Sequence, residues 1–377
     1  MGQTLPLVVF SHLRWDFVYQ RPQHLLSRMA AKRRVIVIEE PVHTPGEPHW
    51  EVIQAPAQVT VYRPHTPLTE SGYADSQLKL IAELLPEIRE KEQLNECIAW
   101  LYTPLALPLA ESLKPTLLIY DCMDELSAFA FAPPQLLQRE AETLAQADLV
   151  FTGGPSLYRS KKDRHPSVHC FPSSVDAAHF QQSQTIAEPA DQANLPHPRC
   201  GFFGVIDERI DLELLRAVAE SHPEWQVVMV GPVVKIDPAQ LPQAPNLHYL
   251  GQRQYVELPA YLGGWDVCIL PFARNEATRF ISPTKTLEYM AAEKPIVSTP
   301  ITDVAEPYGE IVYLGDTPAD FIRACERALN ATQDEQAQRT AGMRTVLANT
   351  SWDRTAQAMH ELIETALESK LAPSETA

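Results

Sequence analysis

The stretch Ile281-Ser-Pro-Thr-Lys-Thr-Leu-Glu-Tyr-Met-Ala-Ala-Glu-Lys-Pro-Ile-Val-Ser298 decides the fold class. Its first part starts like a helix, because Ser282 is a good N-cap and Pro283 suits the first helical position. The apolar run over 295–298 follows at once and predicts a buried strand. A helix that leads directly into a buried strand is typical of parallel α/β architecture.

The same alternation of apolar runs and helical patterns extends along the chain in both directions. Before residue 178, strands are predicted at 5–10, 34–38, 96–102, 116–120, 148–152 and 168–172, and helices at 23–31 and 134–147. After residue 198, strands are predicted at 199–204, 225–230, 246–250, 267–270, 295–298 and 311–314, and helices at 211–221, 283–293 and 319–330. The residues between, 179–198, are polar and proline-bearing and predict a linker. We therefore expect two Rossmann-like, doubly wound domains, at 1–178 and 199–351.

The end of the chain predicts one more helix, over 352–370. From Trp352, the apolar residues Ala356, Met359, Ile363 and Ala366 recur at helical spacing. Such an amphipathic helix needs a surface on which to bury its apolar stripe.

Composition limits the classes of function. The chain has 377 residues, and 31 Lys and Arg against 48 Asp and Glu leave a net charge of −17. An acidic protein repels phosphate backbones, so nucleic acid is not expected as a partner and any phosphate site must be local. The six cysteines form no CxxC pair, which argues against structural zinc and favours buried, reduced thiols. No leader or membrane-spanning run is evident, so we expect a cytoplasmic protein.

The helix that begins near Ser282 is the most readable candidate site. Free backbone N–H groups, the Thr284 hydroxyl and the Lys285 ammonium converge at its start and suit a diphosphate. Glu288 lies one turn further on the same face, where a carboxylate could accept two ribose hydroxyls. The alternative is a capped helix whose Lys and Glu face solvent.

A second candidate is the turn Gly201-Phe-Phe-Gly-Val-Ile-Asp-Glu-Arg209, which follows a predicted strand. Gly204 permits close approach of the backbone to a ligand, and Arg209 could reach a phosphate. The stretch is far from a GxGxxG fingerprint, so nicotinamide binding has little support. An ordinary strand-to-helix turn remains the alternative.

Two loops of the first half carry polar and aromatic side chains directly after predicted strands. Residues 11–24 suit sugar hydroxyls, and we expect His12, Arg14 and Trp15 on the acceptor side. The cluster Tyr120-Asp-Cys-Met-Asp-Glu125 could grip a hydroxylated substrate or supply a base. A metal is not expected there, because a third hard ligand is missing. Solvated loop residues that pack the next helix are the alternative. The expected catalytic residues are Asp124, Asp16 and Arg21.

Four stretches together resemble a known family: 10–24, 120–125, 171–180 and 282–300. Across nearly its whole length the chain is similar to GT-B glycosyltransferases of the large retaining family four, in the bacterial branch of polysaccharide and teichuronic-acid biosynthesis. The resemblance implies two Rossmann-like domains facing across a cleft. The C-terminal domain would bind a nucleotide-diphosphate sugar, and the N-terminal domain would bind the acceptor. Such folds end in a helix that packs back on the N-terminal domain, as the stripe from Trp352 would.

The resemblance also implies site residues. Family four members carry Glu-x7-Glu, and Glu288 matches the second, ribose-binding Glu. The first falls at Phe280, which departs from the pattern, so Asn275, Glu276 and Thr278 are the candidates for contact with the donor sugar. The diphosphate would lie near Gly204, Arg209, Ser282, Thr284 and Lys285, and the base near Arg253 and Tyr255.

The expected function is therefore transfer of a sugar from a nucleotide-diphosphate sugar to a saccharide or lipid-linked acceptor, with retention, in cell-surface or exopolysaccharide biosynthesis. No cofactor or metal is expected, and a lipid-linked acceptor would bring the enzyme to the inner face of the membrane. Two alternatives stay open: a nucleotide-sugar epimerase of the same fold, and a non-catalytic GT-B binding protein.

Overall fold

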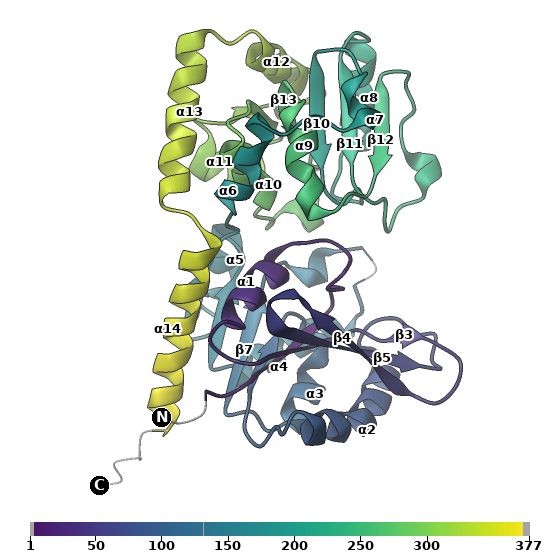
Figure 1. Cartoon of the computed structure of the whole chain (residues 1–377), viewed down its shortest axis with the longest axis vertical. Coiled ribbons are helices and arrows are strands. Elements are labelled where there is room, and N and C mark those ends of the chain that lie inside the picture. Colours follow the sequence, from purple (N-terminus) through teal and green to yellow (C-terminus); the bar gives the residue numbers. More distant parts are fainter. Residues whose placement is uncertain (1–3, 131, 372–377) are drawn as a thin grey trace. The chain divides into compact units, whose positions relative to one another are not determined.

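The protein is described by a computed structural model covering residues 4–130 and 132–371 (Figure 1). The chain divides into two compact units. Among the described residues, the first unit comprises 4–127, 132–172 and 352–371, and the second comprises 128–130 and 173–351.

The first unit is built on a nine-stranded sheet with the order β3-β5-β2-β1-β6-β7-β8-β9, in which β4 also pairs with β5. Its strands are β1 (Leu7–Ser11), β2 (Val35–Glu39), β3 (Val42–His43), β4 (His49–Ala55), β5 (Val59–Thr66), β6 (Ile98–Leu101), β7 (Leu117–Cys122), β8 (Leu149–Thr152) and β9 (Val168–Cys170). All pairings are parallel except that of β4 with β5. The central strands are buried on both faces, as their continuous apolar runs predict.

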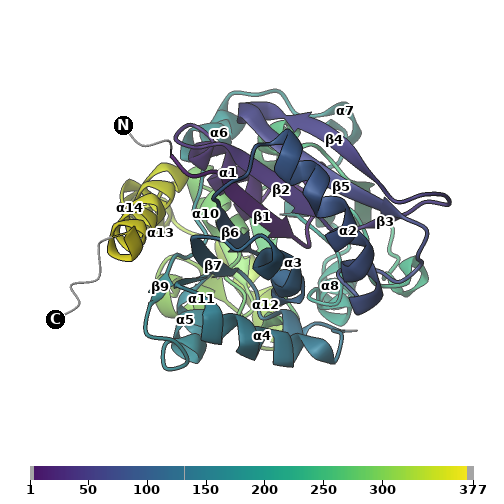
Figure 2. The ribbon, with the colours of Figure 1, turned by 90° about the horizontal axis from the view of Figure 1, so that it is seen from below.

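Helices cover both faces of this sheet. They are α1 (Arg21–Met29), α2 (Asp75–Lys91), α3 (Leu107–Ser112), α4 (Gln135–Gln146), α5 (Pro155–Lys161) and α14 (Trp352–Leu371). Figure 2 shows α1 and α14 on one side and α2, α3 and α4 on the other. The stripe of α14 packs with Leu25, Leu26 and Met29 of α1 in one apolar cluster. The terminal helix is therefore part of the core of the first unit.

The second unit contains a six-stranded parallel sheet with the order β12-β11-β10-β13-β14-β15. Its strands are β10 (Arg199–Phe203), β11 (Gln226–Val230), β12 (Leu247–Gly251), β13 (Val267–Leu270), β14 (Ile296–Ser298) and β15 (Tyr313–Leu314). Its helices are α6 (Ala177–Gln181), α7 (Ala190–Ala193), α8 (Leu212–Ser221), α9 (Leu258–Gly263), α10 (Thr284–Ala291), α11 (Thr302–Tyr308), α12 (Pro318–Leu329) and α13 (Gln333–Ala348). The order reverses between β10 and β13, and ligands of open α/β sheets bind at such a switch point.

The structure corrects the expected linker. Residues 179–198 hold the end of α6 and the whole of α7, and they belong to the second unit, whose boundary lies after Pro172. Phe180 and Gln192 are fully buried, and Gln192 bonds the Tyr261 carbonyl and the Trp265 indole. The polar composition predicted a linker here, but burial of Phe180 and Gln192 packs the segment against the second unit.

The sequence pattern did not predict the strands β3 to β5, the long helices α2 and α13, or the short helices α3, α5, α6, α7, α9 and α11. Strand β4 is mostly exposed and α13 buries only Met343, so neither has a strong apolar period. None of the six cysteines, all within the described residues, forms a disulfide, and all but the half-buried Cys170 are buried. None of the described helices combines the length and apolar character needed to cross a membrane.

Candidate active site

The switch point of the second sheet brings a glycine turn and a lysine together. Gly204 follows β10 with a φ of +140°, and a β-carbon there would lie 2.0 Å from Cε of Lys285. Gly231, after β11, has a φ of +150°, and a β-carbon there would lie 1.9 Å from the Gly204 carbonyl oxygen. The Lys285 ammonium also lies 5.7 Å from the centroid of the Phe202 ring. Two glycines therefore let the lysine reach the ends of the strands.

The helix α10 starts one residue later than predicted. Its N-cap is Pro283, in an extended conformation and without a side-chain cap, so Ser282 is not the N-cap and Pro283 is not the first helical residue. The Ser173 hydroxyl explains the shift, because it donates to the Ser282 carbonyl oxygen at 2.6 Å and holds this residue outside the helix. The Thr284 hydroxyl faces the same serine at 3.4 Å. The first N–H groups of α10 have no partner inside the helix, which suits them to an anion.

Glu288 lies one turn into α10 and is 6% exposed. Burial raises the pKa of its carboxyl to about 7, while the charge of Lys285 acts in the opposite direction. A carboxylate with so little water needs hydrogen-bond donors, and a pair of hydroxyls would supply them. Lys285 and Glu288, about one turn apart on α10, thus interact electrostatically.

Arg209 has a strong internal partner. Its guanidinium donates to both oxygens of the buried Asp207 carboxylate, from Nε at 3.0 Å to Oδ1 and at 3.2 Å to Oδ2, and from a terminal nitrogen at 2.8 Å to Oδ2. Its Cζ also lies 5.6 Å from the Phe129 ring. Asp207 therefore compensates the charge of Arg209, and the role of Arg209 at the diphosphate stays a prediction.

The two residues expected to contact the nucleotide base also bond or stack with other side chains of the second unit. Arg253 donates to the Tyr261 hydroxyl at 2.5 Å and to Asp191 at 2.6 Å. The Tyr255 ring stacks on His179 with centroids 4.3 Å apart. Both residues follow β12 on the carboxyl edge of the sheet, so their position fits the expectation while their side chains are already engaged.

The loop expected to contact the donor sugar is largely held by its own hydrogen bonds. Asn275 and Thr278 cap each other around the short helix Glu276–Thr278, and the Asn275 amide donates to the Glu208 carbonyl at 3.0 Å. Thr278 is buried, whereas Glu276 is exposed beside Arg279. The Arg279 guanidinium lies 5.1 Å from the Phe280 ring. Asn275 and Thr278 therefore shape the loop, and the exposed Glu276 is the candidate of the three with least internal bonding.

In the first unit, Arg21 and Asp121 form a buried ion pair. The guanidinium donates to both carboxylate oxygens, at 3.1 and 2.8 Å, and to the Phe171 carbonyl at 2.8 Å. Burial raises the pKa of Asp121, and Arg21 opposes that shift. Because Arg21 is only 4% exposed, its expected catalytic role is corrected to the structural one of joining α1 to β7.

The turn after β7 is clamped at both ends. Beyond Asp121, Glu125 pairs at 2.8 Å with the ammonium of Lys161, which also pairs at 2.6 Å with Glu140. Lys161 is 2% exposed, and sequence reasoning missed it because nothing in the pattern of α5 marks its burial. Asp124 lies between these clamps, half-buried, and its charge acts on Arg21. The catalytic role of Asp124 stays a prediction.

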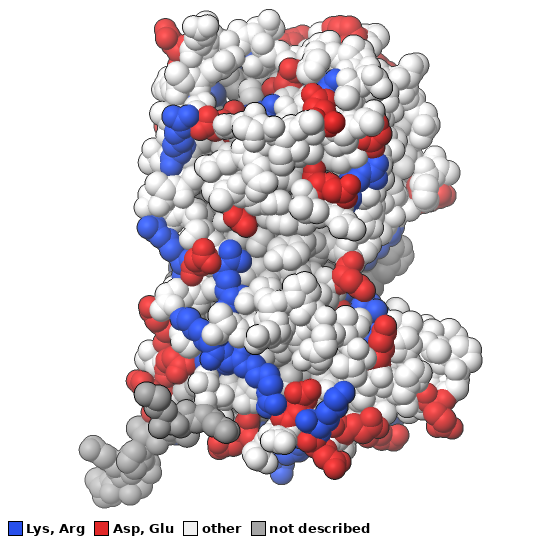
Figure 3. Space-filling view, in the orientation of Figure 1, with Lys and Arg blue, Asp and Glu red and all other residues white. Residues whose placement is uncertain are grey.

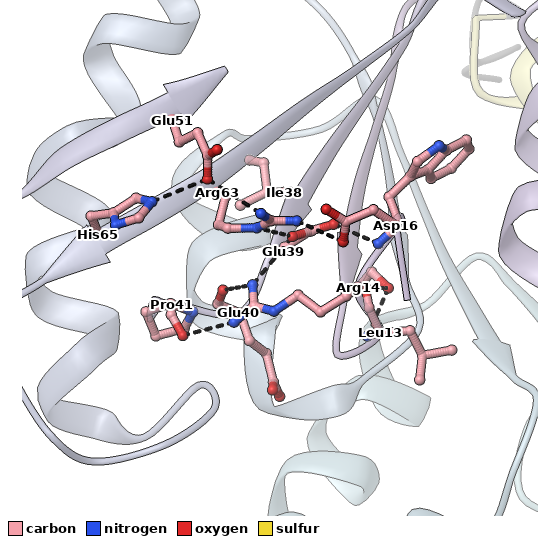
Figure 4. A network of polar contacts seen from close by, with 12 residues as sticks. Leu13, Arg14, Asp16, Ile38, Glu39, Glu40, Pro41, Glu51, Arg63 and His65 are labelled. Atoms are coloured by element: carbon pink, nitrogen blue, oxygen red, sulfur yellow. Dashed lines mark hydrogen bonds and ion pairs between the residues drawn. The ribbon is translucent and has the colours of Figure 1, made fainter. Parts of the chain in front are cut away.

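The loop after β1 is held by a carboxylate that sequence reasoning also missed. Glu39, at the end of β2, bonds the Arg14 guanidinium and the Trp15 N–H (Figure 4). The Arg63 guanidinium donates to Asp16 at 3.0 Å, and the Asp16 side chain is 61% exposed, so its catalytic role stays a prediction. His12 is half-buried in the same loop. The available signal was a glutamate that closes the otherwise apolar run of β2.

Figure 3 shows acidic and basic side chains interspersed over the drawn face. Within residues 4–130 and 132–371, no group of three or more His, Cys, Asp or Glu side chains could hold a metal ion.

Comparison with known proteins agrees with the resemblance seen in the sequence. Residues 197–331 match the model of the family described as "Glycosyl transferases group 1". The "Putative teichuronic acid biosynthesis glycosyltransferase TuaH" of Bacillus subtilis (strain 168) is 26% identical over 287 residues, which cover 71% of this chain and 71% of the relative.

Solved structures confirm the expected fold. A sucrose-phosphate synthase from Thermosynechococcus elongatus has a TM-score of 0.74 at 17% identity, over 97% of this chain and 100% of that one. The E. coli trehalose-6-phosphate structure bound with UDP-2-fluoro glucose has a TM-score of 0.69 at 14% identity, over 96% of this chain and 99% of that one. The expected GT-B architecture of two parallel-sheet α/β units is therefore confirmed.

Proposed function

We propose that this chain, a GT-B glycosyltransferase whose second unit carries the group 1 domain, transfers a sugar from a uridine-diphosphate sugar to a saccharide acceptor in cell-surface polysaccharide biosynthesis. The observation that carries the proposal is the contact of Lys285 with Gly204 at the start of α10, one turn before the buried Glu288. The choice of uridine and of the pathway is supported by the sugar nucleotide in one structural neighbour and by the name of the curated relative.

The donor is held by three features of the second unit. The diphosphate lies against the ammonium of Lys285, the Thr284 hydroxyl and the first N–H groups of α10. The ribose hydroxyls donate to the Glu288 carboxylate. Hydrogen bonds to a buried carboxylate favour its ionised form. Gly204 leaves room beside the backbone for the Lys285 side chain, which a larger residue at this position would displace.

The transfer breaks the bond between the sugar's anomeric carbon and the diphosphate and forms a bond from that carbon to an acceptor oxygen. The acceptor's proton passes to the departing phosphate oxygen. The acceptor attacks on the same face of the sugar that the diphosphate leaves, so the anomeric configuration is retained. Negative charge grows on the diphosphate during this step, and a fixed ammonium and helix N-terminus stabilise it. The step needs no metal or other cofactor, so activity should survive exhaustive chelation.

The acceptor is bound by the first unit, at the carboxyl edge of its sheet, where the loops after β1 and β7 carry Trp15 and Asp124. A lipid-linked saccharide would bring a cytoplasmic enzyme to the inner face of the membrane. Flotation with vesicles that carry such a lipid tests this association.

The proposal is tested by a thermal-shift screen against nucleotides and nucleotide sugars, followed by assays of nucleoside diphosphate release with and without saccharide acceptors. A ligand that binds only the folded state raises the melting temperature as its concentration exceeds Kd. We expect UDP and one UDP-sugar to raise it, and release to depend on an acceptor. Acceptor-independent release of free, epimerised sugar would identify an epimerase, and absence of nucleotide binding would remove the proposal.

A further inference from the structure

The carboxylate of Glu39 is the centre of the polar network in Figure 4. Glu39 ends β2, is fully buried, and accepts bonds from Arg63 Nε at 2.7 Å, the Trp15 N–H at 2.6 Å and the Arg14 guanidinium at 3.2 Å. Two of these three donors come from the loop after β1. One buried carboxylate therefore determines where that loop lies.

The loop is tied to the end of β2 by further bonds. The Arg14 guanidinium also donates to the carbonyl oxygens of Glu40 and Pro41, the second at 3.0 Å. The Ser11 hydroxyl accepts the Leu13 N–H at 3.0 Å. These bonds leave Arg14 and the backbone of residues 13–15 little freedom, so the loop is organised before any ligand arrives.

Stability alone does not account for such a network. Replacing a buried ion pair with apolar residues of similar size is often neutral or stabilising. What apolar residues cannot do is fix the direction of a loop through several directional bonds. The loop that Glu39 fixes is the one that carries Trp15 and Asp16, at the carboxyl edge of the sheet.

The network also turns its positive charge inward. The side chains of Arg63 and Arg14 are 13% and 29% exposed, whereas those of Asp16 and Glu51 are 61% and 44% exposed. The third guanidinium at this edge, that of Arg21, is taken by Asp121. A phosphorylated or carboxylated ligand would therefore meet carboxylates first.

We propose that Glu39 is a positioning residue for the acceptor, and that by holding Arg14 and Arg63 it confines acceptors to saccharides whose contacted ring carries no phosphate or carboxylate. The proposal rests on the proposed function, since it assigns this loop to the acceptor. Glu39 acts through the loop and does not itself touch the substrate.

The test compares wild type with Glu39→Gln, using the UDP-sugar found in the screen and three acceptor pairs. The pairs are glucose and glucose 6-phosphate, N-acetylglucosamine and its 6-phosphate, and galactose and galacturonate. For wild type we expect at least one neutral member to exceed its anionic partner about tenfold in kcat/KM, as expected for a like-charge penalty. Added salt should raise the rate with the anionic member and leave the neutral one unchanged.

In Glu39→Gln we expect the KM for the neutral acceptor to rise about tenfold, since the loop loses a charged hydrogen-bond acceptor. The KM for the donor should stay unchanged, and the preference over the anionic partner should shrink. Hydrogen exchange of residues 12–17 should become faster. Glu92→Gln is the matched control. Glu92 accepts a hydrogen bond of 2.6 Å from the Tyr62 hydroxyl of the same sheet and has no bond to the loop after β1 among those described.

Should Glu39→Gln fail to fold, Arg14→Lys makes the same test, because a lysine cannot bond Glu39 and both carbonyls together. Any of three outcomes overturns the proposal: wild type uses the anionic acceptors as well as the neutral ones or better, wild type uses no neutral acceptor, or the folded variant keeps the acceptor KM of wild type. Donor binding by wild type separates these outcomes from failure of the proposed function, which would abolish that binding as well.

Discussion

The side chain of Lys285 occupies the space that a side chain at Gly204 would need. A β-carbon at Gly204 would lie 2.0 Å from Lys285 Cε and 2.6 Å from Nζ. Residues 81 positions apart in the sequence thus form one site, with the glycine supplying room and the lysine supplying charge.

Gly204→Ala should displace Lys285 and weaken binding of UDP and the UDP-sugar. The backbone φ of +140° adds strain of at least about 1 kcal/mol for a residue with a side chain. Calorimetric titration with UDP measures the loss. Gly46→Ala is the control, since Gly46 has a φ of +117° but no atom within 4 Å of the added carbon. Equal UDP affinity in both variants would contradict the role of this contact.

Lys285→Met should keep the packing of the lysine stem and remove only the ammonium. We expect UDP affinity to fall on the order of tenfold, as for loss of a charge-assisted hydrogen bond. Uridine, which lacks phosphates, should bind equally to variant and wild type. If uridine binding falls in parallel, Lys285 acts on the shape of the site rather than on the diphosphate.

Glu288→Gln should change how the stability of the ligand-free protein depends on pH. The pKa of Glu288 in the folded protein, about 7, lies above the ordinary 4.5. Its neutral form therefore contributes fully to the free energy of unfolding below pH 4.5, and this contribution is lost as pH rises through 7. The variant should gain on the order of 3 kcal/mol over wild type at high pH and little at low pH. Chemical denaturation across this range measures the difference.

The same substitution should weaken nucleotide binding, because an amide cannot accept two ribose hydroxyls as a carboxylate does. Wild type should release a proton when it binds UDP near pH 6, which titration in buffers of different ionisation enthalpy detects. A UDP affinity that is the same for wild type and Glu288→Gln at every pH would remove Glu288 from the ribose site.

Arg21→Met should lower the free energy of unfolding by about 3–5 kcal/mol, because it leaves the buried Asp121 carboxylate without its partner. The double variant Arg21→Met with Asp121→Leu should recover most of this loss. Thermal and chemical unfolding of the four proteins in the cycle measure the coupling. Additive effects would show that the two side chains do not stabilise each other.

Removal of α14 by truncation after Ser351 should destabilise the first unit. Trp352, Met359 and Ile363 are fully buried against it, and each such side chain contributes roughly 1.5–3 kcal/mol. Their sum rivals the whole stability of an ordinary domain. Light scattering should detect aggregation of the truncated chain. A monomeric product with unchanged melting temperature would contradict this packing.

The sequence by itself determined the elements with strong local signals. Apolar runs such as 267–270 and the helix over 211–221 match the structure to within a residue, since burial on both faces leaves strands no alternative pattern. The stripe from Trp352 likewise predicted a helix that must bury one face. The resemblance to GT-B glycosyltransferases followed from four stretches of residues, and the comparisons support it.

Only the tertiary structure decided which charged side chains are available to a ligand. Arg21, Arg209 and Asp16 have the residue types and loop positions of site residues, yet each is engaged by a partner distant in sequence or fixed by local folding. Lys161 gave no sign of its burial, and the one sign for Glu39 was its place at the end of an apolar run. An ion pair forms between side chains that can be distant in the sequence, so local pattern does not reveal it. Local pattern reports the period of apolar residues, whereas the pairing of charges depends on sheet order and helix packing, which set the neighbours across the fold.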